Sequence, residues 1–221
     1  MTTPLHFVRA HTVLSAPSLV PEIRLHLATE ILPLWSKTEE QIAQENLPPP
    51  YWAFAWAGGQ ALARYLLDHA DAVRGRSVLD FGSGSGLVAI AAAKAGAQTV
   101  TASDIDPFAA AAIELNSSIN GVAVDARVDD LLDGACSWDT VLVGDMCYER
   151  PLAERLLDWL SLATKSGTQV FLGDPGRNYF PKSGVEKLAS YQVATSRDLE
   201  DRDVRATAVY RFAARPAAGP T

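Results

Sequence analysis

Three glycines at alternate positions follow an acidic residue in one short segment, Asp80-Phe81-Gly82-Ser83-Gly84-Ser85-Gly86. Glycine reaches backbone angles that a Cβ disfavours, and it allows the main chain to approach a ligand closely. The dinucleotide-binding fingerprint requires Gly-x-Gly-x-x-Gly, but Leu87 stands where its third glycine would fall. An acid directly before the loop would also repel a pyrophosphate, whereas it suits a ligand with an ammonium group. The spacing therefore predicts a loop for a cationic ligand without phosphate.

S-adenosyl-L-methionine meets this description because its methionine tail carries an ammonium group and the molecule contains no phosphate. We expect it as the cofactor and S-adenosyl-L-homocysteine as its product, bound by a set of loop residues: Asp80, Gly82, Ser83, Gly84 and Gly86. The alternative is a turn that only joins a strand to a helix, but such a turn would not need three glycines and an acid.

Acidic residues after the next two predicted strands are candidates for contacts with the adenosine. Asp104 follows the glycine loop at close to the offset where an acid accepts hydrogen bonds from ribose hydroxyls. The Asp-x-Asp-Pro pattern is also typical of a helix N-cap, so we assign Asp104 to the ribose and Asp106 to the cap. Ile105 is included among the cofactor-binding residues. Asp130 is placed to accept from the adenine amino group, although a solvated turn explains it nearly as well.

A further set of candidates follows the strand predicted at residues 138–143. In a doubly wound sheet this strand lies beside the first, so its end faces the ligand at the switch point. We therefore expect Asp145 and Tyr148 beside the reacting atoms and Gly144 beside the cofactor. Trp56 is a candidate for the cofactor as well, because an aromatic face attracts a sulfonium or ammonium cation. Core packing of Trp56, and a loop turn with a packed Tyr148, are the alternatives.

The elements that must position these residues read as alternating strands and helices. The predicted strands are 78–79, 99–103, 124–128, 138–143 and 169–172, followed by an antiparallel pair at 191–195 and 206–212. A helix is predicted at 87–94, after the glycine loop, which makes the fold class α/β with a Rossmann-like doubly wound sheet.

The first 50 residues are predicted to form a helical extension. Residues 1–16 show no clear period and read as a loose arm, and helices are expected over 22–32 and 36–44. Three prolines at 48–50 mark the boundary. We expect residues 51–215 to form the domain that binds S-adenosylmethionine and residues 216–221 to be a frayed tail.

Composition limits the classes of function. The chain has 221 residues, 48% of them hydrophobic, and a formal net charge of −7. This charge argues against broad binding to nucleic acid, which needs a basic surface. The four histidines show no zinc-ligand spacing, so no metal is expected, and no apolar run is long enough to span a membrane. We expect a cytoplasmic monomer.

With these residues in place, the chain resembles the class I, seven-strand S-adenosylmethionine methyltransferases. The Asp-x-x-Tyr pattern at 145–148 resembles the branch of mostly protein-lysine methyltransferases that carries this motif. Three segments together resemble the lysine methyltransferases of the electron-transfer flavoprotein beta subunit: 54–60, 144–149 and 174–177. The resemblance spans roughly residues 17–215. It implies strand order 3-2-1-4-5-7-6 with strand 7 antiparallel, helices on both faces, and that flavoprotein subunit as the protein partner.

The resemblance also implies protein-lysine N-methyltransferase activity on that subunit. A lysine must first lose its proton, which at pH 7 costs about 4–5 kcal/mol from a pKa of about 10.4. We expect Asp145 to receive the incoming ammonium, Tyr148 to aim the lone pair, and water to carry the proton away. Methylation of a ribosomal protein or of a small-molecule amine is the alternative, and a non-catalytic binding module is a further one.

Overall fold

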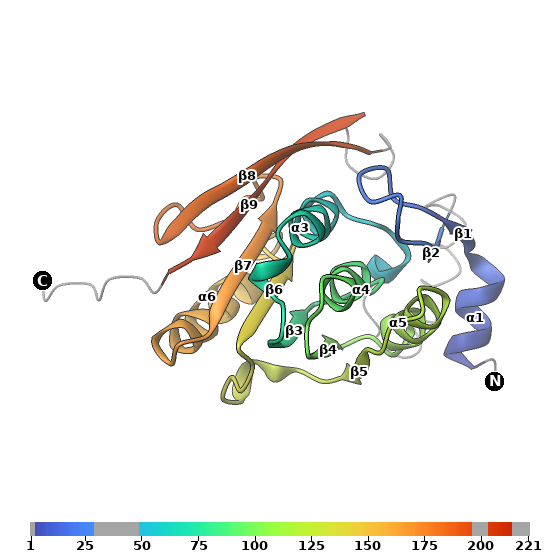
Figure 1. Cartoon of the computed structure of the whole chain (residues 1–221), viewed down its shortest axis with the longest axis horizontal. Coiled ribbons are helices and arrows are strands. Elements are labelled where there is room, and N and C mark those ends of the chain that lie inside the picture. The colour runs from blue at the N-terminus through green and yellow to red at the C-terminus, as the bar shows by residue number, and fades with distance from the viewer. Residues whose placement is uncertain (1–2, 29–48, 196–202, 214–221) are drawn as a thin grey trace, which may run out of the picture.

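A computed structural model describes residues 3–28, 49–195 and 203–213. Its main sheet has seven strands in the order β5-β4-β3-β6-β7-β9-β8 (Figure 1). The strand bounds, in that order, are Asp125–Val128, Thr99–Asp104, Ser77–Phe81, Thr140–Gly144, Gln169–Asp174, Val204–Phe212 and Val185–Ala194. The first five strands are parallel, and β9 is antiparallel to β7 and to β8. This arrangement confirms the predicted strand order, with β9 as the antiparallel seventh strand.

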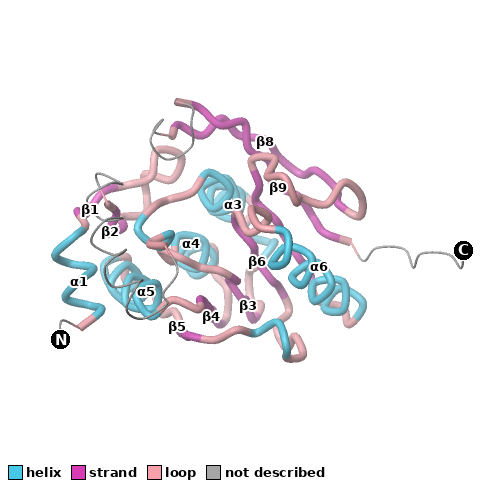
Figure 2. The backbone as a smooth tube through the Cα atoms, turned by 180° about the vertical axis from the view of Figure 1, so that it is seen from behind, coloured by secondary structure: helices cyan, strands magenta, loops and turns pink. Residues whose placement is uncertain are grey.

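Helices cover both faces of this sheet. The helices α3 (Ala57–Asp68), α4 (Leu87–Lys94) and α5 (Pro107–Ile119) pack on one face, and α6 (Arg150–Lys165) packs on the other (Figure 2). Alternate residues of β3 supply the two cores: Val78 packs toward α3 and α4, whereas Leu79 packs toward α6. The carboxyl ends of the parallel strands therefore meet at one edge of a sheet that is buried on both sides.

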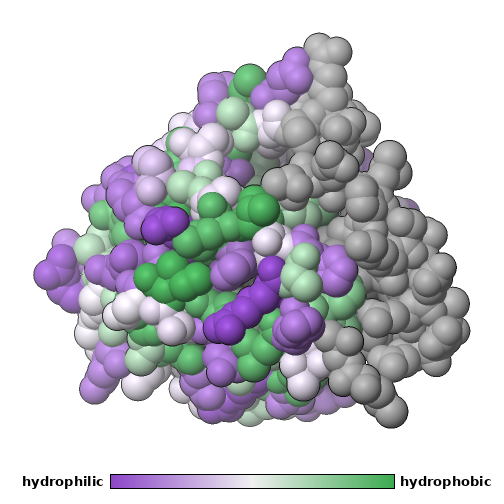
Figure 3. Space-filling view, turned by 90° about the vertical axis from the view of Figure 1, so that its right-hand side faces the viewer, coloured by the Kyte–Doolittle hydropathy of each residue, from purple (hydrophilic) through white to green (hydrophobic). Residues whose placement is uncertain are grey.

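Residues 3–16 are ordered, with the helix α1 (Pro4–His11) packed against α5, so the prediction of a loose arm over 1–16 is wrong for the described residues. This helix begins at an N-cap, Thr3, and buries Phe7 and Val8 against α5 and the turn η1 (Tyr51–Ala53). Figure 3 views the molecule from this side, where apolar and polar groups lie next to one another on the described surface.

The helix predicted over 22–32 is also wrong, because residues Leu25–Leu27 form the strand β2, paired with β1 (Val13–Ser15). The sequence alternates apolar and polar side chains here, which is the period of a strand. Leu25 is fully buried, and the N–H of His26 donates to Oδ1 of Asn116 on α5 at 2.7 Å. The helix expected at 36–44 lies outside the described residues. The division into extension, domain and tail stays a prediction.

Candidate functional site

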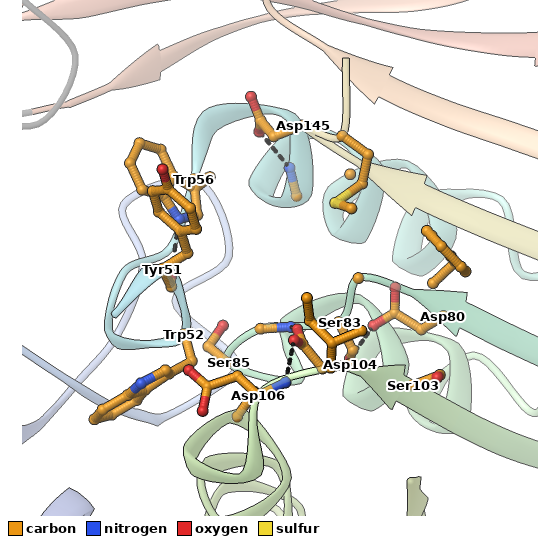
Figure 4. A pocket seen from close by; sticks show the side chains of 18 of the residues that line it. Tyr51, Trp52, Trp56, Asp80, Ser83, Ser85, Ser103, Asp104, Asp106 and Asp145 are labelled. Atoms are coloured by element: carbon orange, nitrogen blue, oxygen red, sulfur yellow. Dashed lines mark hydrogen bonds between the residues drawn. The ribbon is translucent and has the colours of Figure 1, made fainter. Parts of the chain in front are cut away.

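A pocket of about 710 Å³ opens at the carboxyl end of the parallel strands (Figure 4). Its walls come from the loops after β3, β4, β5, β6 and β7 and from the segment that precedes α3. The structure brings eleven predicted site residues together around it: Trp56, Asp80, Gly82, Ser83, Gly84, Asp104, Ile105, Asp130, Gly144, Asp145 and Tyr148. The twelfth, Gly86, is not among the lining residues; it is the N-cap of α4, and its φ of 81° explains the glycine.

The glycine loop after β3 forms a cradle that side chains would fill. Gly82 and Gly84 have φ values of 64° and 52°, in the left-handed region that favours glycine. A Cβ on Gly82 would lie 2.7 Å from Cε of Met146, and one on Gly84 would lie 3.6 Å from Cα of Trp52. The loop therefore exposes main chain to the pocket, as the sequence predicted.

The side chain of Asp80 hydrogen-bonds to the glycine loop and to α4. It is almost fully buried and its Oδ2 accepts hydrogen bonds from the hydroxyl of Ser83 at 2.5 Å and from the N–H of Ala89 at 2.9 Å. Burial, and to a smaller extent the charge of the nearby Asp104, raise the pKa of Asp80 to about 7 despite the lowering effect of these two hydrogen bonds. A cationic ligand at the loop would offset the cost of ionising this buried acid.

Asp104 connects the end of β4 to the glycine loop. Its Oδ2 accepts from the N–H of Gly84 at 2.9 Å and its Oδ1 from the N–H of Asp106 at 3.1 Å. Burial raises the pKa of Asp104. The assignment of Asp106 to the helix cap is confirmed, because its side chain accepts from the N–H of Phe108 at the start of α5.

Asp130 caps the short turn η3 (Leu131–Asp133) at the pocket wall. Its Oδ1 accepts from the N–H of Leu132, and its Oδ2 accepts from Arg155 at 2.7 Å. These contacts agree with the turn that the sequence left open as an alternative. A contact between Asp130 and adenine stays a prediction.

Asp145 joins three elements at the other side of the pocket. One carboxylate oxygen accepts from the N–H groups of Gly58 and Gly59, in the first turn of α3. The other accepts from Nε of Arg177 at 2.9 Å and from Nη2 at 2.7 Å. Asp145 is buried, and its φ of 58° is unusual for a residue with a side chain, so the surrounding bonds hold a strained backbone.

The pairing of Arg177 with Asp145 was missed by sequence reasoning. Arg177 belongs to the loop after β7, where Oδ1 of Asp174 accepts from the N–H groups of Gly176 and Arg177, both at 2.7 Å. The residue types of the segment Asp174-Pro175-Gly176-Arg177 are typical of a tight turn at the end of a strand. Its contact with a residue 32 positions earlier follows only from the strand order.

The residues around the pocket fit the predicted cofactor. The glycine cradle offers main-chain contacts, Asp80 and Asp104 offer carboxylates, and Ile105, Phe54 and Leu87 are among the apolar residues that line the pocket. Within residues 3–28, 49–195 and 203–213, no group of three or more His, Cys, Asp and Glu side chains is placed to hold a metal ion. No helix in this described part is long and apolar enough to cross a bilayer.

The chain is similar to the electron transfer flavoprotein beta subunit lysine methyltransferase of Danio rerio, with 41% identity over 92% of this chain and 81% of that protein. It is 40% identical to the Homo sapiens protein of the same description, over 90% of this chain and 78% of that one. The family model for ribosomal protein L11 methyltransferase (PrmA) matches residues 60–145. A solved structure of magnesium protoporphyrin IX methyltransferase from Synechocystis, with bound S-adenosylmethionine, has a similar fold, with a TM-score of 0.52 and 18% identity over 71% of this chain and 80% of that chain.

Fold, pocket and these similarities define the protein as an S-adenosylmethionine-dependent methyltransferase of the Rossmann-like, seven-strand class. The extent of identity with the two relatives then fixes the family. The chain belongs to the electron transfer flavoprotein beta subunit lysine methyltransferases.

Proposed function

We propose that this enzyme transfers methyl groups from S-adenosylmethionine to lysine side chains of the electron transfer flavoprotein beta subunit. The observation that carries the proposal is the 41% identity over 92% of the chain to a lysine methyltransferase of that subunit. The pocket supports it, because the glycine loop and the Asp145–Tyr148 segment face one cavity.

The cofactor side follows from the residues of the loops after β3 and β4. When bound, S-adenosylmethionine supplies an electrophilic methyl group on a sulfonium centre. We propose that Asp80 and the glycine cradle receive the methionine tail, and that Asp104 and Ile105 hold the ribose and adenine, with Asp130 at the adenine end. These side chains exclude water and fix the orientation of the reacting groups, which is the main protein contribution to a displacement reaction.

The acceptor side follows from the end of β6. The acceptor lysine must be neutral to react, and deprotonation at pH 7 costs about 4–5 kcal/mol. We propose that Tyr148 orients the amine and that Asp145 supplies the negative charge that attracts the incoming ammonium, while water removes the proton. Hydrogen bonds from Gly58, Gly59 and Arg177 already hold the Asp145 carboxylate, so its position is set before a substrate arrives.

Incubation of the purified enzyme with S-adenosylmethionine and the recombinant flavoprotein subunit tests this proposal, with mass spectrometry of the lysine-containing peptides. We expect methylated lysines with the parent enzyme. Asp145→Ala and Tyr148→Phe should each lower turnover at least tenfold and leave the affinity for S-adenosylhomocysteine within about twofold. Normal turnover in both variants would contradict the roles proposed for Asp145 and Tyr148. A flavoprotein subunit without methylated lysines would contradict the proposed substrate.

A ribosomal protein substrate is the second candidate. The family model for ribosomal protein L11 methyltransferase matches residues 60–145, and the protein of that description from Laribacter hongkongensis is 34% identical over 78% of this chain. The matched segment carries the cofactor loop and ends at Asp145, before Tyr148 and the loop after β7. It therefore favours a shared cofactor site more than a shared substrate. Parallel reactions with ribosomal protein L11 and with a small-molecule amine would separate the three substrates.

A further inference from the structure

Three of the aromatic side chains that line the pocket lie next to one another, Tyr51, Trp56 and Tyr148. Tyr51, in the turn η1, lies between the other two: its ring centroid is 5.8 Å from that of Trp56 and 5.5 Å from that of Tyr148. All three line the pocket together with Glu149. Figure 4 shows Tyr51 and Trp56 side by side across the pocket from Asp80 and Asp104. Sequence reasoning gave Tyr51 no role.

Hydrogen bonds position the Trp56 ring and the main chain of Tyr51. Nε1 of Trp56 donates to the carbonyl oxygen of Tyr51 at 2.9 Å, and the N–H of Tyr51 donates to the carbonyl of Pro49 at 2.6 Å. Trp56 is also the N-cap residue of α3, and Phe54 packs edge-on against its ring at 6.0 Å. A ligand would therefore meet ring faces whose spacing is set in advance, which lowers the entropic cost of binding.

The electrostatic character of this wall suits a cation. The guanidinium of Arg177 lies 5.8 Å from the ring centroid of Trp56, so one cation from the chain already uses that ring. Burial, followed by the charge of Glu149 among smaller causes, raises the pKa of Tyr51 and of Tyr148, that of Tyr148 to about 12. Both rings stay neutral at physiological pH, and their quadrupoles and the Glu149 carboxylate attract positive charge.

We propose that Tyr51, Trp56 and Tyr148 form the binding site for the acceptor lysine, with their ring faces against its aliphatic stem and its ammonium group. This inference rests on the proposed function as a lysine methyltransferase and adds Tyr51 as a substrate-binding residue. The apolar stem of lysine packs well on rings, and its charged end gains cation–π attraction that a neutral side chain of the same shape lacks. Methylated lysine keeps the charge and remains a ligand for the same rings.

Two peptides of the same sequence test the proposal in calorimetric titrations of the enzyme saturated with S-adenosylhomocysteine. One carries dimethyllysine, and the other carries its neutral carbon isostere. We expect the cationic peptide to bind the parent about tenfold more tightly. The ratio of the affinities for the cationic and the neutral peptide should stay near tenfold in Tyr51→Phe, which keeps the ring. It should fall to about twofold or less in Tyr51→Ala and Tyr51→Leu. Tyr51→Leu keeps an apolar side chain and serves where the alanine variant does not fold.

Equal binding of the two peptides to the parent, or an unchanged preference in Tyr51→Leu, overturns the proposal. A loss of S-adenosylhomocysteine affinity in Tyr51→Leu as large as the loss of peptide affinity would assign the ring to the cofactor and also overturns it. The peptide titration measures binding to the complex with S-adenosylhomocysteine and requires no methyl transfer. A failure to methylate the flavoprotein subunit would therefore leave this test able to succeed.

Discussion

Arg177 donates two hydrogen bonds to the same oxygen of Asp145, from Nε at 2.9 Å and from Nη2 at 2.7 Å. The other oxygen of Asp145 accepts from main-chain N–H groups at the start of α3. Both partners are largely buried, with side-chain exposures of 17% for Arg177 and 8% for Asp145. The pair therefore joins the loop after β7, the end of β6 and the first turn of α3, and it fixes the side of the pocket that we propose for the acceptor lysine.

Replacement of Arg177 should impair catalysis through Asp145. Arg177→Lys keeps the charge but loses the planar fork of donors, so we expect kcat to fall about tenfold with an unchanged KM for S-adenosylmethionine. In an Asp145→Asn background the same substitution should have little further effect on kcat, because the two residues act as a unit. Steady-state kinetics of the four proteins measures both effects. A lower KM for the lysine substrate in Arg177→Lys would show instead that Arg177 competes with the substrate.

Asp104→Asn should weaken cofactor binding. The carboxylate lines the pocket and accepts from the main-chain N–H groups of Gly84 and Asp106, so the variant loses both a charge and one acceptor oxygen. We expect the dissociation constant for S-adenosylhomocysteine, measured by calorimetry, to rise about 10- to 100-fold. Asp71→Asn is the matched control because its side chain is fully exposed. Equal affinities in parent and Asp104→Asn would remove Asp104 from the cofactor site.

Replacement of either of two adjacent glycines of α3 by alanine should change the free energy of unfolding by very different amounts. A Cβ on Gly58 would meet the carbonyl of Gly173, with the carbonyl carbon at 2.8 Å and Oδ2 of Asp145 at 2.5 Å. A Cβ on Gly59 would meet only Cγ2 of Val88, at an ordinary 3.8 Å. We expect Gly58→Ala to lower the free energy of unfolding by at least about 2 kcal/mol, because main chain must move. Gly59→Ala should change it by about 1 kcal/mol at most, with helix propensity favouring the alanine. Urea denaturation measures both, and equal values would contradict the close packing of α3 on β7.

Local patterns predicted the parts of the site that depend on local physics. The alternate glycines and the apolar runs of the parallel strands correctly predicted the position of the glycine loop after β3. The helix at 87–94 was predicted with its observed bounds. Tyr51 and Arg177 were missed because their contacts join segments far apart in the chain. The strand at Leu25–Leu27 was predicted as a helix because residues 22–32 mix apolar and charged side chains, while tertiary contacts with α5 decide its conformation.

The buried carboxyl of Asp80 should make stability depend on pH. Burial raises its folded-state pKa to about 7, far above the value of an exposed aspartate, so between about pH 4 and 7 the folded protein holds a proton that the unfolded chain has released. The free energy of unfolding should therefore fall as pH rises through this window, more steeply in the parent than in Asp80→Asn, by up to about 1.4 kcal/mol per pH unit. Asparagine keeps an acceptor for Ser83 and Ala89 but does not ionise. Urea denaturation at a series of pH values measures the two slopes, with Asp71→Asn as the exposed control. Parallel slopes for parent and Asp80→Asn would show that the carboxyl of Asp80 ionises in the folded protein as it does in the unfolded chain.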